Sequence, residues 1–139
     1  MEKYFVNYAQ AVALKELGFD EKCFKYYRSD KEFCNFLNYE VIEFDDTEYI
    51  TNSISTILWC DKHCAAPLKA QVFEWFREKH NLFLLMQVGG HNGKYQTFYF
   101  NIFKFGKNLY NSQFRSQTSV YTYEEAESAV IDKLIELVK

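Results

Sequence analysis

Hydrophobic residues in the first part of the chain recur at helical spacing. In residues 4–17 they stand three or four positions apart, at Phe5, Ala9, Val12, Ala13 and Leu17, which predicts a helix with one buried stripe. Gly18 follows, where a residue of left-handed conformation ends many helices. Asp20 is suited to cap a second, short helix over residues 21–27.

The pattern between residues 33 and 59 is less regular. Residues 40–44 fit a strand with a turn at Asp45 and Asp46, and residues 53–59 fit either a strand or a helical turn. Together with the two preceding helices, this pattern predicts that residues 1–64 form a mainly helical N-terminal extension.

A further helix is predicted to begin at Pro67, because a proline lacks the N–H that has no partner in the first turn of a helix. The residues expected on its buried face are Leu68, Val72, Trp75 and Phe76. We expect this helix to end near His80, with Asn81 as its C-terminal breaker. Residues 83–88 then read as a short apolar strand.

Two more strands are predicted after this one. Residues 89–93 are rich in glycine and predict a hairpin turn, and residues 95–105 follow with aromatic and β-branched residues at a period of two. Residues 106–108 predict a second turn. Residues 114–121 predict a third strand that is rich in Ser, Thr and Gln, so one of its faces is expected to contact water.

The last helix carries the most complete set of local signals. Thr122 is suited to the N-cap, with Glu125 three residues later as its capping-box partner. The stripe expected to be buried is Ala126, Ala129, Val130, Leu134 and Leu137. Residues 65–139 thus predict a helix, three antiparallel strands and a helix, with both helices on one face of the sheet. The whole chain is expected to be a single α+β domain.

Composition predicts a folded domain and indicates its cellular location. The chain has 139 residues, 48% of them hydrophobic, with only one proline and five glycines, which is unlike a disordered segment. No apolar run approaches the roughly 20 residues of a membrane span, and the start has no export signal. We therefore expect a cytoplasmic protein with no membrane partner, whose four cysteines are free thiols.

Charge is distributed unevenly along the chain. Residues 1–64 carry 7 basic and 12 acidic side chains, whereas residues 65–139 carry 9 and 7. From Lys79 to Tyr123 there is no Asp or Glu, and aromatic rings are frequent. Basic and aromatic side chains together suit stacked bases and phosphates. The candidate ligand-binding residues are Lys94, Tyr95, Tyr99, Lys104, Lys107 and Arg115.

The strand predicted over residues 95–105 is apolar on both sides. Phe98, Phe100 and Ile102 fall on one side, and Tyr99, Asn101, Phe103 and Phe105 fall on the other. The two helices cover only one face of a sheet. The second face therefore meets residues 1–64, another subunit, or a ligand, and the sequence leaves these three alternatives open.

Other chemistry is poorly supported by the sequence. Cys60, His63 and Cys64 are close enough to share a zinc ion, with Cys23 or Cys34 as a fourth ligand, but structural zinc sites usually have two close pairs of ligands. We therefore predict no metal site and buried thiols instead.

The chain has no phosphate-binding loop, nucleophile elbow, dinucleotide fingerprint or paired-carboxylate motif. We predict no catalytic residue and no cofactor, so the protein is not expected to be an enzyme.

The order of elements in residues 65–139 resembles the double-stranded RNA-binding domain. That family has lysines at the start of its last helix to bind phosphates. This chain has Thr122, Tyr123, Glu124 and Glu125 at that place, and glutamates repel a nucleic-acid backbone. The resemblance therefore concerns the order of elements and argues against that mode of RNA binding.

A second resemblance rests on two segments, APLKAQVFEWFREKHNLF and YTYEEAESAVIDKLIELVK. They resemble small uncharacterised proteins of Bacteroidales bacteria and their phages. This resemblance implies a bacterial host cell and an accessory protein that acts by binding, for example by inhibiting a host system. We expect a protein partner or self-association, with binding of a nucleotide signal or nucleic acid as the alternative.

Overall fold

The structure is a computed structural model that describes residues 2–28, 30–35, 50–53, 63–91, 95–115 and 122–139. The chain divides into two compact units, Met1–Leu68 and Lys69–Lys139. Both helices and strands are present, so the predicted α+β class is confirmed. Among the described residues, no helix is both long and apolar enough to cross a membrane.

The N-terminal unit begins with a 3-10 turn, Glu2–Tyr4, and continues with α1, Tyr8–Glu16. Asn7 caps α1 in a capping box with Gln10. Because α1 starts four residues later than predicted, Phe5 lies outside it and pairs with Leu68 in an isolated bridge. The stripe predicted for this helix was therefore wrong: its buried residues are Gln10, Ala11 and Leu14. Gly18, at φ 88°, follows the helix as predicted.

The N-terminal unit also contains a small antiparallel sheet that the sequence analysis did not predict. Its strands are β1 (Lys25–Tyr27), β2 (Phe33–Asn35) and β3 (Cys64–Ala65), in the order β2–β1–β3. The helix predicted over residues 21–27 was wrong, because β1 pairs on both sides with strands distant in sequence. Asp20 accepts hydrogen bonds from the backbone and hydroxyl of Ser53 instead of capping a helix.

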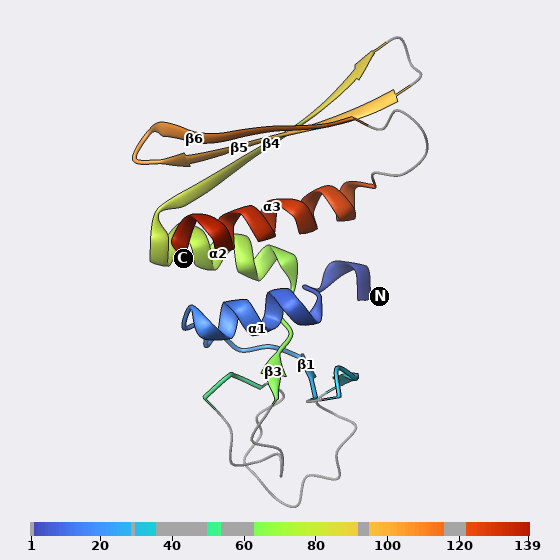
Figure 1. The fold of residues 1–139 in the computed structure, drawn as a ribbon, viewed down its shortest axis with the longest axis vertical. Helices are drawn as coiled ribbons and strands as arrows, with labels where there is room; N and C mark the ends of the chain where they lie inside the picture. Colours follow the sequence, from blue (N-terminus) through green and yellow to red (C-terminus); the bar gives the residue numbers. More distant parts are fainter. Residues whose placement is uncertain (1, 29, 36–49, 54–62, 92–94, 116–121) are drawn as a thin grey trace, which may run out of the picture. The chain divides into compact units, whose positions relative to one another are not determined.

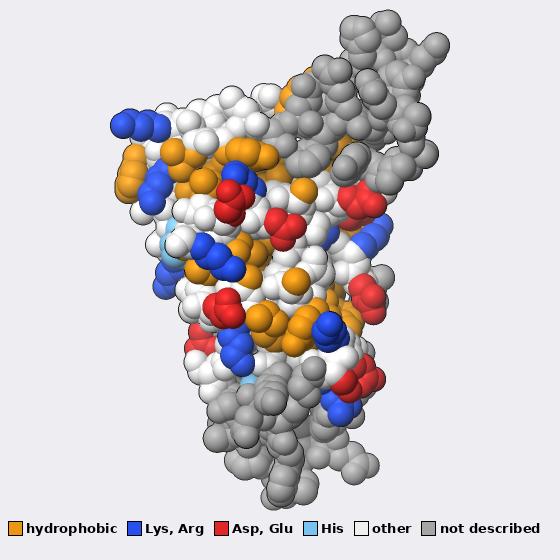
Figure 2. Space-filling model, in the orientation of Figure 1, with side chains coloured by type: hydrophobic (Ala, Val, Ile, Leu, Met, Phe, Trp, Pro, Cys, Tyr) orange, Lys and Arg blue, Asp and Glu red, His pale blue; other side chains and the backbone are white. Residues whose placement is uncertain are grey.

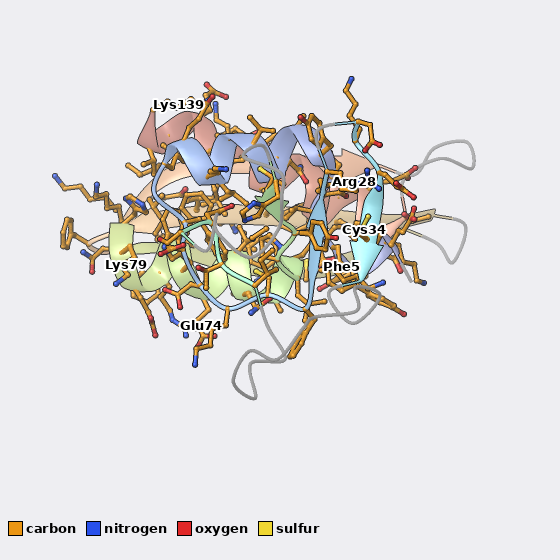
Figure 3. The ribbon with its side chains drawn as sticks, turned by 90° about the horizontal axis from the view of Figure 1, so that it is seen from below. Phe5, Arg28, Cys34, Glu74, Lys79 and Lys139 are labelled. Atoms are coloured by element: carbon orange, nitrogen blue, oxygen red, sulfur yellow. The ribbon has the colours of Figure 1, made fainter. Side chains whose placement is uncertain are left out.

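Aromatic rings pack together in the N-terminal unit. Phe5, labelled in Figure 3, meets the ring of Phe33 edge-on at 5.3 Å between centroids. Tyr27 also packs on Phe33, at 5.1 Å, and its hydroxyl donates to the carbonyl of Val6 at 2.7 Å. The strand predicted over residues 40–44, the turn at 45–46 and nearly all of the element predicted over 53–59 lie outside the described residues.

The C-terminal unit follows the predicted order of elements. It contains α2 (Lys69–His80), the strands β4 (Leu82–His91), β5 (Tyr95–Lys104) and β6 (Lys107–Arg115), and α3 (Tyr123–Val138). The strands form an antiparallel sheet in the order β4–β5–β6. Both helices lie on the same side of this sheet, as Figure 1 shows and as predicted.

The core of the C-terminal unit lies between the sheet and its helices. The buried residues of β5 are Phe98, Phe100 and Ile102, and those of α2 are Lys69, Val72, Trp75 and Phe76. Helix α3 buries Ala126, Val130, Ile131, Leu134 and Ile135. Its predicted capping box is present, since Thr122 Oγ1 accepts from the Glu125 backbone and Glu125 accepts from the Thr122 backbone. Asn81, at φ 54°, ends α2 as predicted.

The strand boundaries of this unit differ from the prediction. Gly89 and Gly90 belong to β4, so the glycine-rich segment extends a strand before any turn. The turn between β5 and β6 consists of Phe105 and Gly106, both with positive φ, and β6 begins at Lys107, seven residues before the predicted third strand. Two consecutive positive φ angles make a tight hairpin, which returns the chain into the sheet at once.

Candidate interaction surface

One face of the C-terminal sheet is left uncovered by α2 and α3. We call it the open face. Pairing across β4, β5 and β6 places alternate residues on it, because directly opposed residues of a sheet share a face. Its described side chains are Phe83, Leu85, Gln87, Tyr99, Asn101, Phe103, Asn108 and Asn111.

The open face is apolar toward the end of the sheet that holds the β5–β6 turn. Phe83 is 49% exposed and Leu85 is 45% exposed. Phe83 pairs directly with Phe103, which is half-buried. An antiparallel sheet with one face in water usually alternates apolar and polar residues. The apolar side chains on this face thus do not follow the pattern of a water-facing surface.

Farther along the same face, Tyr99 lies flat against the sheet over a glycine. A Cβ atom built on Gly89 would stand 2.7 Å from Cε2 of Tyr99. Only a glycine leaves room for the ring in this position. This close approach explains why the glycine stands within β4, and it keeps the tyrosine ring low on the open face.

Amide side chains occupy the open face of β6. Nδ2 of Asn108 donates to Oδ1 of Asn111 at 2.5 Å, and Oδ1 of Asn108 accepts from the backbone of Tyr110 at 3.1 Å. These bonds span an irregularity in the β5–β6 register at Ile102 and Phe103, where an extra residue of β6 forms a bulge. On the helix-facing side, the ammonium of Lys133 in α3 lies 4.9 Å from the ring centroid of Tyr110.

The described side chains of the open face carry no charge, and the register adds Arg115, opposite Thr97, and His91, opposite Tyr95, to the rows of this face. The acidic residues of the C-terminal unit all lie on α2 and α3, for example Glu74, which projects from α2 in Figure 3. In Figure 2, hydrophobic side chains gather along the sheet, with basic side chains at the end that holds the β5–β6 turn, where Lys104 and Lys107 pair. Nucleic-acid binding depends on cations that contact phosphates, and this face presents none in its described part.

Two of the predicted ligand-binding residues, Lys104 and Lys107, lie at the end of the sheet that holds the β5–β6 turn. Lys104 and Lys107 are exposed and pair across the β5–β6 turn, in the same row as Leu82 of the helix-facing side. Tyr95 stands nine residues from Lys104 on β5, about 30 Å away along a strand. Tyr99 lies between them, on the open face.

The remaining candidate residues are described only in part. Arg115 pairs with Thr97 near the start of β5, and its side chain lies outside the described part of the chain, as does that of Tyr95. Lys94 lies wholly outside it. Among the described candidates, Lys104 and Lys107 therefore lie together at one end of the sheet, away from the position of Tyr95 at the other end of β5.

Sequence reasoning missed the two most informative residues of this face, Phe83 and Leu85. Residues 83–88 were read as a continuous apolar strand, which does not distinguish one face from the other. Phe105 was predicted to lie on the second face of the strand at 95–105, but it stands in the turn after that strand, 76% exposed at φ 48°. A bulky residue in the left-handed region is uncommon, since Asn and Gly are favoured in such a turn.

A separate polar cluster joins the first turns of α2 and α3. Lys69 is buried, and its ammonium donates to the backbone carbonyl of Glu124 at 2.7 Å. Burial lowers the pKa of Lys69, an effect that nearby Glu127 and Glu124 oppose. Burial also raises the pKa of Glu127, which Lys69 opposes. Because the Lys69 ammonium of α2 bonds to the backbone carbonyl of Glu124 in the first turn of α3, it joins these two helices.

The cysteines of the hypothetical zinc site are described in part. Cys60 lies outside the described residues, and Nε2 of buried His63 lies 3.2 Å from the carbonyl oxygen of Thr51. Burial raises the pKa of Cys64, and burial with Glu21 and Asp20 raises that of Cys23 to about 12. A metal ligand must be a thiolate, which these environments disfavour. Within the described ranges, no three His, Cys, Asp or Glu side chains are grouped to hold a metal ion.

Comparisons of this chain with protein-family models, with curated proteins and with solved structures found no match. The chemistry of the open face is therefore the basis for any functional proposal.

Proposed function

We propose that this protein is a small, non-enzymatic accessory protein of phage or mobile-element origin that acts by binding a protein surface through the open face. The phage or mobile-element origin rests on the resemblance of residues 66–83 and 121–139 to Bacteroidales and phage proteins. Inhibition of a host system is one way in which such a protein acts.

The observation that carries the binding role is the exposure of Phe83 and Leu85 on a sheet face that the two helices leave uncovered. Their exposed fractions correspond to about 180 Å² of apolar surface, and its burial contributes about 4.5 kcal/mol at ~25 cal/mol per Å². Exposed apolar patches rimmed by polar side chains commonly mark interaction sites. The amides of Gln87, Asn101 and Asn111 supply such a rim.

The test compares two single substitutions on β4 that differ in the face they change. Leu85→Lys places a charge on the open face, whereas Val88→Lys places one at a position 61% exposed on the helix-facing row, opposite Phe98. Tagged wild type and both variants are incubated with a Bacteroidales cell extract, and the retained proteins are quantified by mass spectrometry. We expect a protein that the wild type and Val88→Lys retain and that Leu85→Lys loses by about tenfold. Identical sets of retained proteins for all three would contradict the proposal.

A second function has one observation in its favour. Lys104 and Lys107 are exposed on either side of Phe105, in three strands that contain no acidic residue. A nucleotide or single-stranded nucleic acid would contact these cations and stack on the ring. The melting temperature of the protein would then rise with cyclic dinucleotides or oligonucleotides, and the rise would shrink as salt increases. If none of these ligands shifts the melting temperature at low salt, this alternative is excluded.

A further inference from the structure

The end of the C-terminal unit that holds the β5–β6 turn combines cations with an exposed aromatic ring. We propose that this end binds the surface of an anionic lipid bilayer, with the ring of Phe105 inserted between the headgroups. The inference goes beyond the proposed function, because it concerns the turn and the helix end beside it and not the open face. The expectation of no membrane partner rested on the lack of a spanning run, which a surface contact does not need.

The conformation of Phe105 is the first observation in favour of this contact. The residue is 76% exposed, and its φ of 48° lies in the left-handed region. Both properties are unfavourable for phenylalanine, because glycine or asparagine fits such a turn without placing an apolar ring in water. Residues held in such conformations are concentrated at sites that contact ligands. A partner outside the chain accounts for this ring, since it takes no part in the core.

Three exposed lysines lie at the same end of the unit as the ring. Lys104 and Lys107 pair across the turn, and the ammonium of Lys104 lies 6.0 Å from the ring centroid of Phe105. Lys79 stands in the last turn of α2, which Figure 1 shows on the side of the β5–β6 turn. Anionic bilayers attract such groups of cations. The lysine stems can extend along apolar surface while the ammonium groups stay among the headgroups.

Acidic side chains leave these cations in excess. The three strands contain no Asp or Glu. On the helices, Glu78 lies in the last turn of α2, whereas Glu136 of α3 is held 2.8 Å from the ammonium of Lys133. The end therefore keeps a positive charge, which is complementary to an anionic surface.

The position of the ring favours a flat partner over a nucleic acid. Phe105 and Gly106 form a two-residue turn beyond the last pair of the two strands, so the exposed ring stands at the extremity of the sheet. Single-stranded nucleic acid instead follows a groove in which several rings stack on successive bases. Leu109, the extra residue of the β6 bulge, is also exposed, at 45%. An aliphatic side chain enters the headgroup region readily but has no aromatic face for stacking.

The experiment measures co-sedimentation of the full chain with vesicles of phosphatidylcholine that contain about 30% phosphatidylglycerol. We expect the affinity for these vesicles to be at least about tenfold higher than for pure phosphatidylcholine. Because the lysines supply most of this difference, the affinity should fall more than about tenfold as salt rises from about 50 to 500 mM.

Variants of the turn test the ring and the cations separately. Asparagine accepts the left-handed region, so Phe105→Asn keeps the turn and should lower the vesicle affinity by about tenfold or more. Phe24→Asn is the matched control, because Phe24 is 60% exposed but belongs to the N-terminal unit. This control should change the affinity by less than about twofold. Replacing both Lys104 and Lys107 by Gln should lower it by about 25-fold, since each cation near an anionic surface contributes about fivefold.

Four results would overturn the inference. They are no binding to anionic vesicles at low salt, equal binding to both kinds of vesicle, an affinity that Phe105→Asn leaves unchanged, and a loss with Phe24→Asn as large as with Phe105→Asn. Circular dichroism verifies that each variant is folded. A single-stranded oligonucleotide is tested in parallel by fluorescence anisotropy. If it binds through Phe105 while the vesicles do not, the turn contacts nucleic acid and the bilayer is the wrong partner.

Discussion

Acidification is expected to destabilise the C-terminal unit through His80, the last residue of α2. Its ring meets Trp75 at 4.7 Å and Phe76 at 5.7 Å between centroids. Its Nε2 is buried and has no hydrogen-bond partner among the described residues. A histidine cation at the end of a helix is ordinarily favourable. Here burial, with Lys104 as a second cause, lowers the pKa of His80 from 6.5.

Because the pKa of His80 is lower in the folded protein than in the unfolded chain, acid reduces the free energy of unfolding. The unfolded chain takes up a proton near pH 6.5, whereas the folded chain resists it until a lower pH. The contribution of His80 to stability is therefore complete above pH 6.5 and is lost as the pH falls from 6.5 toward the folded pKa. Each tenfold difference in proton affinity between the two states corresponds to about 1.4 kcal/mol.

His80→Phe is the variant that isolates this effect. A phenyl ring keeps the edge-on contact with Trp75 and removes the unpartnered nitrogen, so we expect the variant to be more stable than the wild type by about 1 kcal/mol at pH 7.5. The advantage should grow between pH 6.5 and 5. Glu127 acts in the opposite direction above pH 4.5, because its raised pKa favours folding as it protonates. Since both proteins contain Glu127, its contribution cancels in the difference.

The assay is urea denaturation followed by tryptophan fluorescence at pH 7.5, 6.5, 5.8 and 5, in a Trp59→Phe background in which Trp75 alone reports. Circular dichroism at each pH verifies that both proteins start folded. A difference between wild type and His80→Phe that stays constant over this range would refute the reasoning. A difference in stability that shrinks on acidification would show that the favourable charge at the C-terminal end of α2, and not burial, determines the pKa of His80.

Three further substitutions or reagents test the fold itself. Leu134→Ala should cost about 2–5 kcal/mol of unfolding free energy because Leu134 is buried. Leu137→Ala should cost less than about 1 kcal/mol because Leu137 is 37% exposed. Equal losses in urea titrations would contradict the packing of α3. Thr122→Ala removes the capping bond to Glu125 and should cost about 1 kcal/mol by the same measurement; an unchanged midpoint would count against the cap. Cys23 is buried and its pKa is raised to about 12, so it should react with a thiol reagent at pH 7.5 only after unfolding. Mass spectrometry that finds rapid labelling of Cys23 in the native protein would contradict its burial.

Helix ends were the part of the fold that local sequence determined best. The capping box of Thr122 and Glu125, the end of α2 at Asn81 and the glycine after α1 are all present in the structure. Such signals act over three or four residues. The start of α1 was misjudged, because Phe5 has helical spacing but takes a bridge partner, Leu68, that is distant in the chain.

Strands were harder to predict, because their partners are remote. Residues 25–27 form β1 only because β2 and β3 lie on either side of them. In β6, the two-residue turn at Phe105 and Gly106 sets the register from Lys107 onward. A turn that contains phenylalanine in the left-handed region is not recognisable from residue preferences, so the third strand was placed too late.

For the candidate site, the sequence by itself determined which kinds of residue the sheet carries. It established a strand region with no acidic residue and an aromatic strand that is apolar on both sides. Only the tertiary structure decided how these residues are shared between two faces and two ends. Side-chain alternation assigns faces within a strand, but pairing of remote strands determines which side chains become neighbours. The extended conformation of β5 separates Lys104 from Tyr95, whereas pairing brings Lys107 beside Lys104 and places Phe83 and Leu85 on the open face.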